Sequence, residues 1–266
     1  MDTDTGVHDP AELARFYEQA YSQADSGEGA RYARWRALGA TAKADHVLAL
    51  CARAGIWAGG QPTNTLEVGC GDGALLCELR RRAFGGRLAG VEIAQAAVEI
   101  ARERPEIDAV ELYDGVRLPC ADGAYELGVL SHVLEHVGAP EALLAEVARV
   151  CGVVVVEVPL EGNLSAGRPS KLAHSAEIGH LRRLSRARAR RIVADADLRI
   201  VCELEDPLAL AAHTFFATGP RARAWATAKW ALRRGLHTFA PPLARRLFTV
   251  HYACLCMPAG ARVRPI

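Results

Sequence analysis

The chain has 266 residues, of which 50% are hydrophobic and 24% are charged, and its formal net charge is +1. This composition excludes a disordered or collagen-like chain, because it can build a core and its 24 glycines follow no fixed period. No run reaches the roughly 18 to 20 apolar residues of a membrane span, and the acidic start, MDTDTGVHDP, does not resemble a signal peptide. The eight scattered cysteines are typical of buried thiols, so we expect a cytoplasmic protein with one large domain.

Residues 10–55 carry apolar and aromatic side chains at helical spacing, with a break at 26–29. From residue 65 onward, short β-rich segments alternate with helical ones, which is typical of βαβ units and a parallel sheet covered on both faces. Strands are expected at 65–69, 87–93, 109–113, 125–131 and 151–159, and helices at 74–83, 94–105 and 140–150. An irregular loop at 160–180 is then followed by a helix at 185–196, a strand at 198–204, a helix at 225–239 and a final strand near 247–256.

The segment LEVGCGDGALL at 66–76 places three glycines between a strand and a helix. Glycine permits a tight turn there and lets a ligand approach the backbone. Because the string Gly69-x-Gly71-x-x-Ala74 also satisfies the loose dinucleotide pattern, the spacing alone does not choose the ligand.

Charge narrows the choice of ligand. Glu67 precedes the glycine loop and Asp72 lies within it. Two carboxylates there would repel a pyrophosphate. They would suit a ligand that carries an ammonium and a sulfonium, such as S-adenosylmethionine. Glu92 ends the next predicted strand, where a carboxylate can accept hydrogen bonds from ribose hydroxyls. Asp114 follows the third strand, where it can accept a hydrogen bond from an adenine amino group.

With these features, the chain resembles the class I S-adenosylmethionine-dependent methyltransferases of the small-molecule type. The similarity lies in LEVGCGDG at 66, GVEIA at 90, YDGVRLPCADGAYELGVLSHVLEHV at 113–137, LLAEVARV at 143 and GHLRRLS at 179. It covers residues 60–205 in the family's order and spacing, whereas residues 206–246 carry no motif of the family.

The resemblance implies a doubly wound, Rossmann-like α/β fold with a seven-stranded, mostly parallel sheet and an antiparallel last strand. A helical N-terminal extension or lid at 1–60 would precede the methyltransferase domain at 61–266, in which 206–246 form an insert or a second lid. The implied cofactor is S-adenosylmethionine, the product S-adenosylhomocysteine, and the reaction a methyl transfer to oxygen or nitrogen of a small molecule.

The resemblance also assigns roles to residues. It places the glycine loop at the methionine part of the cofactor, Glu92 at the ribose, Asp114 with Gly115 at the adenine, and Ser131 with His132 beside the transferred methyl group. The full set of expected cofactor-binding residues is Glu67, Gly69, Cys70, Gly71, Asp72, Gly73, Glu92, Ile93, Asp114, Gly115, Ser131 and His132.

The string HVLEH at 132–136 matches the inverted zinc-protease signature HxxEH. It falls on a predicted strand-to-helix turn and has no identified third ligand, so we expect no metal. A hydrogen bond that holds the turn is the preferred role of His136. If the acceptor is a hydroxyl, His136, His132 and His180 are the candidate catalytic bases, although His180 could equally cap a helix.

Residues 180–266 hold 16 basic and 5 acidic residues, and no acidic residue follows Asp206. This asymmetry favours an anionic small-molecule acceptor or simply a solvated surface; nucleic acid is not an expected partner. The six arginines at 182–191 are interpreted as a solvated helix face, and the segment 225–239 as a lid, because its apolar positions form no single stripe for a membrane surface.

Several alternatives stay open. The N-terminal aromatic residues Tyr17, Tyr21, Tyr32 and Trp35 belong either to a helix that closes over the cofactor or to ordinary core packing. An NAD-type oxidoreductase, a non-catalytic S-adenosylmethionine-binding protein and a protein that docks on anionic membranes are the competing functions. The sequence does not indicate the oligomeric state.

Overall fold

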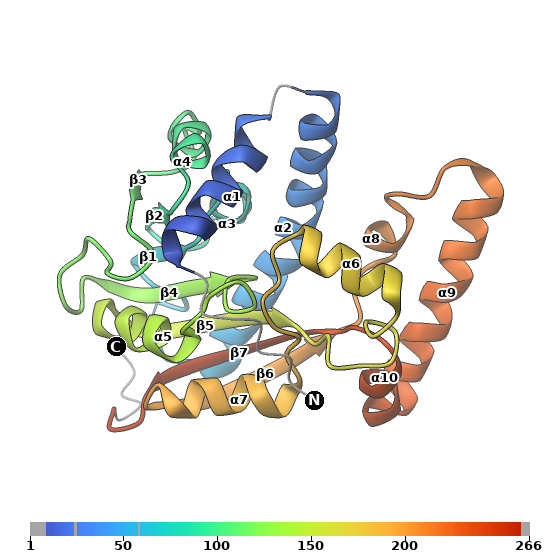
Figure 1. Ribbon diagram of the computed structural model, residues 1–266. Coiled ribbons are helices and arrows are strands. Elements are labelled where there is room, and N and C mark those ends of the chain that lie inside the picture. The colour runs from blue at the N-terminus through green and yellow to red at the C-terminus, as the bar shows by residue number, and fades with distance from the viewer. Residues whose placement is uncertain (1–8, 24–25, 58, 262–266) are drawn as a thin grey trace.

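The computed structural model describes residues 9–23, 26–57 and 59–261, so the acidic start at residues 1–8 lies outside the described residues. The described chain forms one seven-stranded sheet with helices on both faces (Figure 1). The strands lie across the sheet in the order β3-β2-β1-β4-β5-β7-β6. Their bounds are Asn64–Val68 (β1), Arg87–Glu92 (β2), Ala109–Leu112 (β3), Tyr125–Ser131 (β4), Cys151–Pro159 (β5), Leu198–Asp206 (β6) and His251–Pro258 (β7).

The sheet is parallel except for β7, which lies between β5 and β6 and runs antiparallel to both. This confirms the predicted mostly parallel sheet with an antiparallel last strand. β1 pairs with both β2 and β4, so the order of the strands reverses at this point. In open α/β sheets, ligands bind beyond the carboxyl ends of the strands at such a reversal.

The side chains of β5 alternate between two apolar cores. Val153 and Val155 pack with α2, α3 and α4 on one face, whereas Val154 and Val156 pack with α5 and α7 on the other. Because both faces of the strand are buried, its sequence is a continuous valine run rather than an alternation. These helices span Gly27–Ala54 (α2), Ala74–Arg81 (α3), Gln95–Arg102 (α4), Pro140–Val150 (α5) and Arg186–Asp195 (α7).

The N-terminal part is helical, as predicted, and consists of α1 (Pro10–Ser22) and α2. Asp9 caps α1 and Ser26 caps α2, each by accepting a hydrogen bond from a nearby backbone N–H. The predicted break at 26–29 is therefore the start of α2. None of the 13 residues of α1 is buried.

Two predicted elements need correction. The stretch expected to be an irregular loop contains a helix, α6 (Pro169–Glu177), whose first turn holds Pro169, a residue that fixes φ and needs no N–H acceptor there. The last strand begins at His251 instead of near residue 247, because Pro241–Leu247 form the helix α10.

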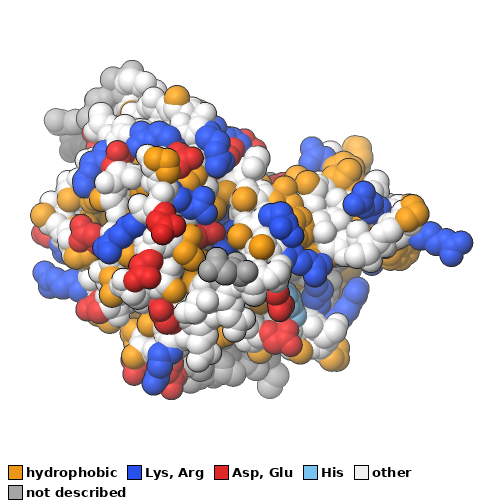
Figure 2. Space-filling model, turned by 90° about the horizontal axis from the view of Figure 1, so that it is seen from above, with side chains coloured by type: hydrophobic (Ala, Val, Ile, Leu, Met, Phe, Trp, Pro, Cys, Tyr) orange, Lys and Arg blue, Asp and Glu red, His pale blue; other side chains and the backbone are white. Residues whose placement is uncertain are grey.

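The helix α9 (Gly219–Phe239) lies at the outer edge of the molecule, beside α8 (Leu210–Thr214) and α10 (Figure 1). None of the 21 residues of α9 is buried, and Trp225, Leu232 and Phe239 are 64%, 64% and 88% exposed. Since they recur at every seventh position, they form one apolar stripe, which corrects the prediction that this segment has none. Hydrophobic and basic side chains share the lobe on the right of Figure 2. No described helix is both long enough and apolar enough to cross a bilayer.

Candidate active site

A cavity of about 1340 Å³ opens at the carboxyl ends of β1, β2 and β4 and reaches the start of β7. Single small-molecule pockets have roughly 300 to 1,000 Å³, so this cavity has room for a cofactor and an acceptor. The predicted residues that line it are Glu67, Gly69, Cys70, Gly71, Asp72, Glu92, Ile93, Gly115, Ser131, His132, His136 and His180. Gly73 and Asp114 do not belong to its lining.

The loop between β1 and α3 passes through left-handed backbone conformations. Gly69 and Gly71 have φ values of +72° and +54°, which residues with a side chain rarely adopt. A Cβ atom on Gly69 would lie 2.8 Å from Val133 Cγ2, and one on Gly71 would collide with the Tyr21 hydroxyl. Glycine is therefore required at both positions by the backbone and by its close neighbours.

Glu92, at the end of β2, holds this loop. Its Oε2 accepts a hydrogen bond from Gly71 N at 2.8 Å, and its Oε1 accepts from Ile93 N at 2.6 Å and Ala94 N at 3.2 Å. Burial raises the pKa of the Glu92 carboxyl, although these N–H donors oppose the rise. A carboxylate offers about four acceptor positions, so one is left for a ligand hydroxyl.

Glu67 lies on β1 and is 4% exposed, and its Oε2 has no hydrogen-bond partner among the described residues. Burial raises the pKa of this carboxyl to about 8; the Lys43 ammonium opposes the rise, and the neighbouring Asp72 adds to it. A buried polar atom without a partner costs roughly 1–3 kcal/mol. A cationic hydrogen-bond donor in the cavity would remove this cost.

Asp72 has cationic partners that the sequence analysis did not foresee. Its Oδ2 lies 2.9 Å from Arg36 Nε and 3.5 Å from Arg104 Nη2. Two guanidinium groups therefore offset its charge, and the raised pKa leaves Glu67 largely uncharged at neutral pH. The predicted repulsion of a pyrophosphate by these two carboxylates is weaker than the sequence suggested.

Asp114 lies outside the cavity, on an exposed turn after β3. Its Oδ1 accepts hydrogen bonds from Arg117 N at 2.7 Å and Val116 N at 2.8 Å, which lower the pKa of its carboxyl. Its neighbours Tyr113 and Gly115 do line the cavity. The two neighbours of Asp114 thus face the cavity, whereas the Asp114 carboxylate accepts the hydrogen bonds that hold the exposed turn.

The HxxEH string forms a turn after β4 and no helix. His136 is buried, and its Nδ1 lies 3.0 Å from the Gly179 carbonyl oxygen and 2.9 Å from Tyr17 Oη. Burial lowers the pKa of His136 to about 4. His136 thus ties the turn to α1 and to the end of α6. His180 stands against the His136 ring and pairs with Glu161 Oε2 at 2.8 Å.

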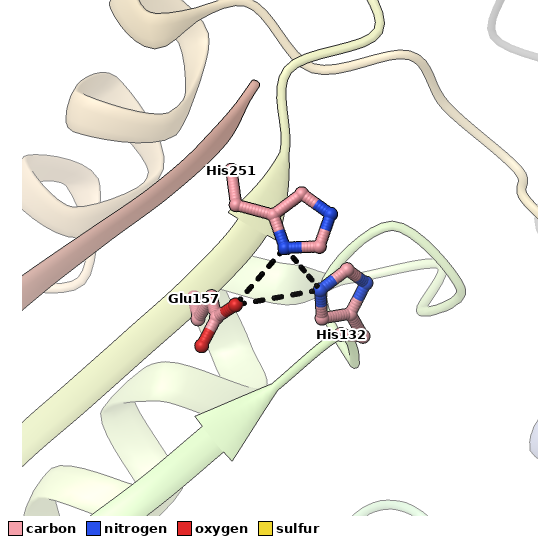
Figure 3. A group of neighbouring side chains, drawn as sticks. All are labelled: His132, Glu157 and His251. Carbon is pink, nitrogen blue, oxygen red and sulfur yellow. Dashed lines mark hydrogen bonds and ion pairs between the residues drawn. The ribbon is translucent and has the colours of Figure 1, made fainter. Parts of the chain in front are cut away.

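His132 belongs to a separate group at the cavity wall (Figure 3). It follows β4 and meets Glu157 of β5 and His251, the first residue of β7; we call these three the histidine–glutamate cluster. Glu157 Oε1 lies 3.1 Å from His251 Nδ1 and 3.6 Å from His132 Nε2. His46 of α2 places its Nδ1 3.3 Å from the same oxygen. Burial would raise the pKa of Glu157, but these imidazoles hold it well below its ordinary value.

The sequence analysis missed Glu157, His251 and His46, although the sequence held a signal for Glu157. This glutamate is the only charged residue in the apolar run 151–159. A carboxylate inside a buried strand requires polar partners, so the interruption itself marks a site.

Two other predictions concern the surroundings of the cavity. Tyr17, Tyr21, Tyr32 and Trp35 all line it, so the aromatic side chains of α1 and α2 border the cavity. The arginines of α7 agree with a charged surface, because Arg188 pairs with Glu141 at 3.0 Å and Arg190 with Glu203 at 2.9 Å.

Residues 66–152 match the family model described as a methyltransferase domain. This range contains the glycine loop, Glu92 and the turn at the end of β4. Residues 66–152 are a methyltransferase domain. The sheet order and the antiparallel β7 around this domain are those expected of the class I S-adenosylmethionine-dependent methyltransferases.

A curated relative of the methyltransferase domain is an uncharacterized 37.1 kDa protein in transposon TN4556 from Streptomyces fradiae. It is 38% identical over 92 residues, which cover 33% of this chain and 26% of that protein. The chain therefore spans about a quarter of the length of this relative.

Solved structures show the same fold over most of the chain. One of them is geranyl diphosphate C-methyltransferase from Streptomyces coelicolor A3(2), in complex with Mg²⁺, geranyl diphosphate and S-adenosyl-L-homocysteine. It matches with a TM-score of 0.59 and 18% identity over 93% of this chain and 97% of that one. The [4+2]-cyclase SpnF matches with a TM-score of 0.52 and 19% identity over 80% of each chain. The fold of the methyltransferase domain thus carries more than one reaction.

We expect His136 to make stability depend on pH. Its folded-state pKa of about 4 lies below the ordinary 6.5, so on acidification the unfolded chain takes up a proton before the folded chain does. This contribution is complete above pH 6.5 and is lost toward pH 4, by up to about 3 kcal/mol in the free energy of unfolding. Denaturant unfolding across this range should show a shallower pH dependence for His136→Gln than for the wild type.

The exposed residue His174 provides the matched control, His174→Gln, for the loss of an imidazole. Equal pH dependences in the wild type and His136→Gln would show that His136 does not carry this effect.

Proposed function

We propose that this protein is an S-adenosylmethionine-dependent methyltransferase that methylates oxygen or nitrogen of a small-molecule acceptor and releases S-adenosylhomocysteine. The observation that carries this proposal is the buried Glu67 carboxyl, whose Oε2 lacks a partner among the described residues. An ammonium group beside it would donate the missing hydrogen bond and stabilise the ionised carboxylate. A pyrophosphate in that place offers no donor and adds negative charge.

We assign the cofactor residues along the cavity wall. Glu67 and the glycine loop would hold the methionine part, with Gly69, Cys70 and Gly71 as lining residues and Asp72 and Gly73 as residues that shape the loop. The free acceptor position of Glu92 suits a ribose hydroxyl. Ile93 and Gly115 would flank the adenine, and Ser131 and His132 would face the methyl end. When bound, S-adenosylmethionine supplies a methyl group that its sulfonium has already activated.

We place the acceptor in the part of the cavity that α6, α8 and α9 border. Lys43, Lys171 and Arg233 line the cavity together with the aromatic rings of Trp35 and Phe216. Cationic and aromatic side chains together suit an acceptor with a negative charge and an apolar part. Geranyl diphosphate, which the Streptomyces coelicolor methyltransferase binds, combines these two properties.

Methyl transfer requires the nucleophile, the methyl carbon and the sulfur in line, in a space that excludes water. α1 and α2 border the cavity and supply this cover. An amine acceptor needs no strong base, whereas a hydroxyl gains from a group that takes or weakens its proton. The histidine–glutamate cluster, with two of its members on the cavity wall, is our candidate for that role.

We expect calorimetric titration to show binding of S-adenosylmethionine and S-adenosylhomocysteine but not of NADH. Glu92→Gln should weaken binding of both adenosyl ligands about tenfold, because it replaces a charged acceptor by a neutral one. Glu99→Gln on the exposed side of α4 is the matched control and should bind as the wild type does.

Binding of NADH alone would replace the proposal with an NAD-type oxidoreductase. Binding of the adenosyl ligands without methyl transfer to any acceptor in a broad screen would favour a non-catalytic binding protein.

We also expect cofactor binding to release a proton from Glu67. With a pKa of about 8 in the empty cavity, this carboxyl is protonated at pH 7, and an adjacent ammonium favours the carboxylate. Titrations at pH 7 in buffers of different ionisation enthalpy should therefore report release of about one proton per S-adenosylmethionine. The proton release from Glu67 should be absent in Glu67→Gln. Any release that remains in this variant comes from the amino group of the ligand and can be subtracted. An equal release in wild type and variant would remove Glu67 from the methionine site.

A second candidate function, docking on an anionic membrane, has its own supporting observation. The exposed stripe of Trp225, Leu232 and Phe239 lies on a helix that also carries Lys229 and Arg221, in a region without acidic residues. Apolar side chains that enter the interface and basic ones that face anionic lipid are the pattern of a surface-bound helix.

At low salt the protein should sediment with phosphatidylserine-containing vesicles, and salt should weaken the association. Leu232→Glu should reduce the bound fraction severalfold, whereas Leu112→Glu, at an exposed leucine of β3, should not. Absence of sedimentation at low salt would eliminate this function.

A further inference from the structure

The histidine–glutamate cluster brings three ligand atoms to one point behind the cavity wall, where His132 and His251 line the cavity. His132 Nε2, His251 Nδ1 and Glu157 Oε1 face one another from three chain segments, at the ends of β4 and β5 and the start of β7 (Figure 3). Their separations are 3.3 Å between the two nitrogens, 3.1 Å from His251 to Glu157 and 3.6 Å from His132 to Glu157.

These separations match ligands around a single metal ion. With bonds of about 2.1 Å, two ligands lie about 3.0 Å apart at a right angle and about 3.4 Å apart at the tetrahedral angle. We propose that His132, Glu157 and His251 bind a divalent transition-metal ion on the acceptor side of the cavity. Two imidazoles and one carboxylate leave coordination positions open toward the cavity, as in catalytic metal sites.

The lone pairs of the cluster support an ion at its centre. Two imidazole nitrogens that face each other at 3.3 Å need a proton or a cation between them. A single proton between the two nitrogens forms a hydrogen bond that joins them, but Glu157 Oε1 then needs hydrogen-bond donors from elsewhere. A metal ion satisfies all three acceptors at once.

The cluster also has the outer hydrogen-bonding groups of a metal site. The other ring nitrogen of His132, Nδ1, lies 3.1 Å from Glu135 Oε1, and the Ser131 hydroxyl lies 3.3 Å from Glu157 Oε2. Metal-binding histidines commonly have a carboxylate beside their second ring nitrogen, and Glu135 holds this place as an ion-pair neighbour of His132. His132 also holds a φ of +61°, a costly conformation for a residue with a side chain and one found most often at functional sites.

The charges of this region suit a divalent ion that prefers nitrogen. The carboxylates of Glu135 and Glu157 balance two positive charges, while Asp206 pairs with His46 at 3.3 Å. Two imidazole ligands favour Zn²⁺, Co²⁺ or Fe²⁺ over Mg²⁺ and Ca²⁺, which prefer oxygen ligands.

The consequence for the reaction rests on the proposed methyltransferase function. A metal ion at the acceptor side favours an oxygen acceptor, because it binds a hydroxyl and lowers the pKa of that hydroxyl. The acceptor hydroxyl loses its proton to solvent, its oxygen forms the bond to the methyl carbon, and the sulfur keeps the electron pair of the broken C–S bond.

The test uses untagged, full-length protein that has been treated with a chelator and desalted. Titration with Co²⁺ should give one bound ion per chain, with visible ligand-field absorption that Zn²⁺ abolishes. His251→Ala and Glu157→Gln should each weaken Co²⁺ binding about a hundredfold. Glu157→Gln keeps the shape of the side chain, so it tests the site even if His251→Ala does not fold.

His180→Ala is the matched control, because His180 belongs to the neighbouring group of Glu135, His136 and His180. It should bind Co²⁺ as the wild type does. Loss of Co²⁺ binding in His180→Ala alone would place the ion in the group of Glu135, His136 and His180. Absence of Co²⁺ binding in the wild type would overturn the proposal. Equal Co²⁺ affinity in wild type and Glu157→Gln would also overturn it. Binding of S-adenosylmethionine to the chelated protein, measured in parallel, tests the proposed function separately from the metal.

Discussion

A carboxylate buried at the end of a β-strand must find polar partners, and this sheet contains three of them. Glu67, Glu92 and Glu157 are 4%, 6% and 1% exposed, on β1, β2 and β5. Burial of an unpaired charge costs more free energy than the net stability of most folds. The cost is offset in a different way for each of the three carboxyl groups. Backbone N–H groups of the glycine loop and the start of α4 satisfy Glu92, and imidazoles surround Glu157. Glu67 keeps one oxygen without a partner among the described residues, and burial raises the pKa of its carboxyl to about 8, so the uncharged form is favoured there.

The cover of the cavity is attached in a different way from the sheet. The sheet is held by two apolar cores, whereas α1 has no buried residue and connects to the rest through hydrogen bonds, such as Tyr17 to His136 and Glu18 to Ala96 N. Segments with few buried apolar contacts belong to the least stable parts of a protein. In the function proposed above, α1 is the part that gives way to an entering ligand while the strands that carry the carboxylates stay fixed.

The sequence predicted most of the fold because its signals are local. Valine runs, glycine turns and helical spacing each extend over a few residues, and the glycine loop and Glu92 fall within one βαβ unit. The errors have physical causes: α6 has a polar sequence, and its Pro169 was interpreted as a loop residue although proline also starts helices. The histidine–glutamate cluster was not predictable in the same way, since His132 and His251 are 119 positions apart. The pairing of Asp72 with Arg36 was missed for the same reason.

The position of β7 has a consequence for the order in which the molecule becomes functional. β7 is the last of the described strands in chain order, yet it lies inside the sheet and is the neighbour through which β6 joins β5. During synthesis, β5 and β6 therefore have unpaired edges until β7 has left the ribosome, and unpaired strand edges can pair with other chains. The same insertion brings His251 to Glu157 and His132. Closure of the sheet and assembly of the cluster are thus one event, so a chain that stops before β7 has neither a complete sheet nor a complete cluster.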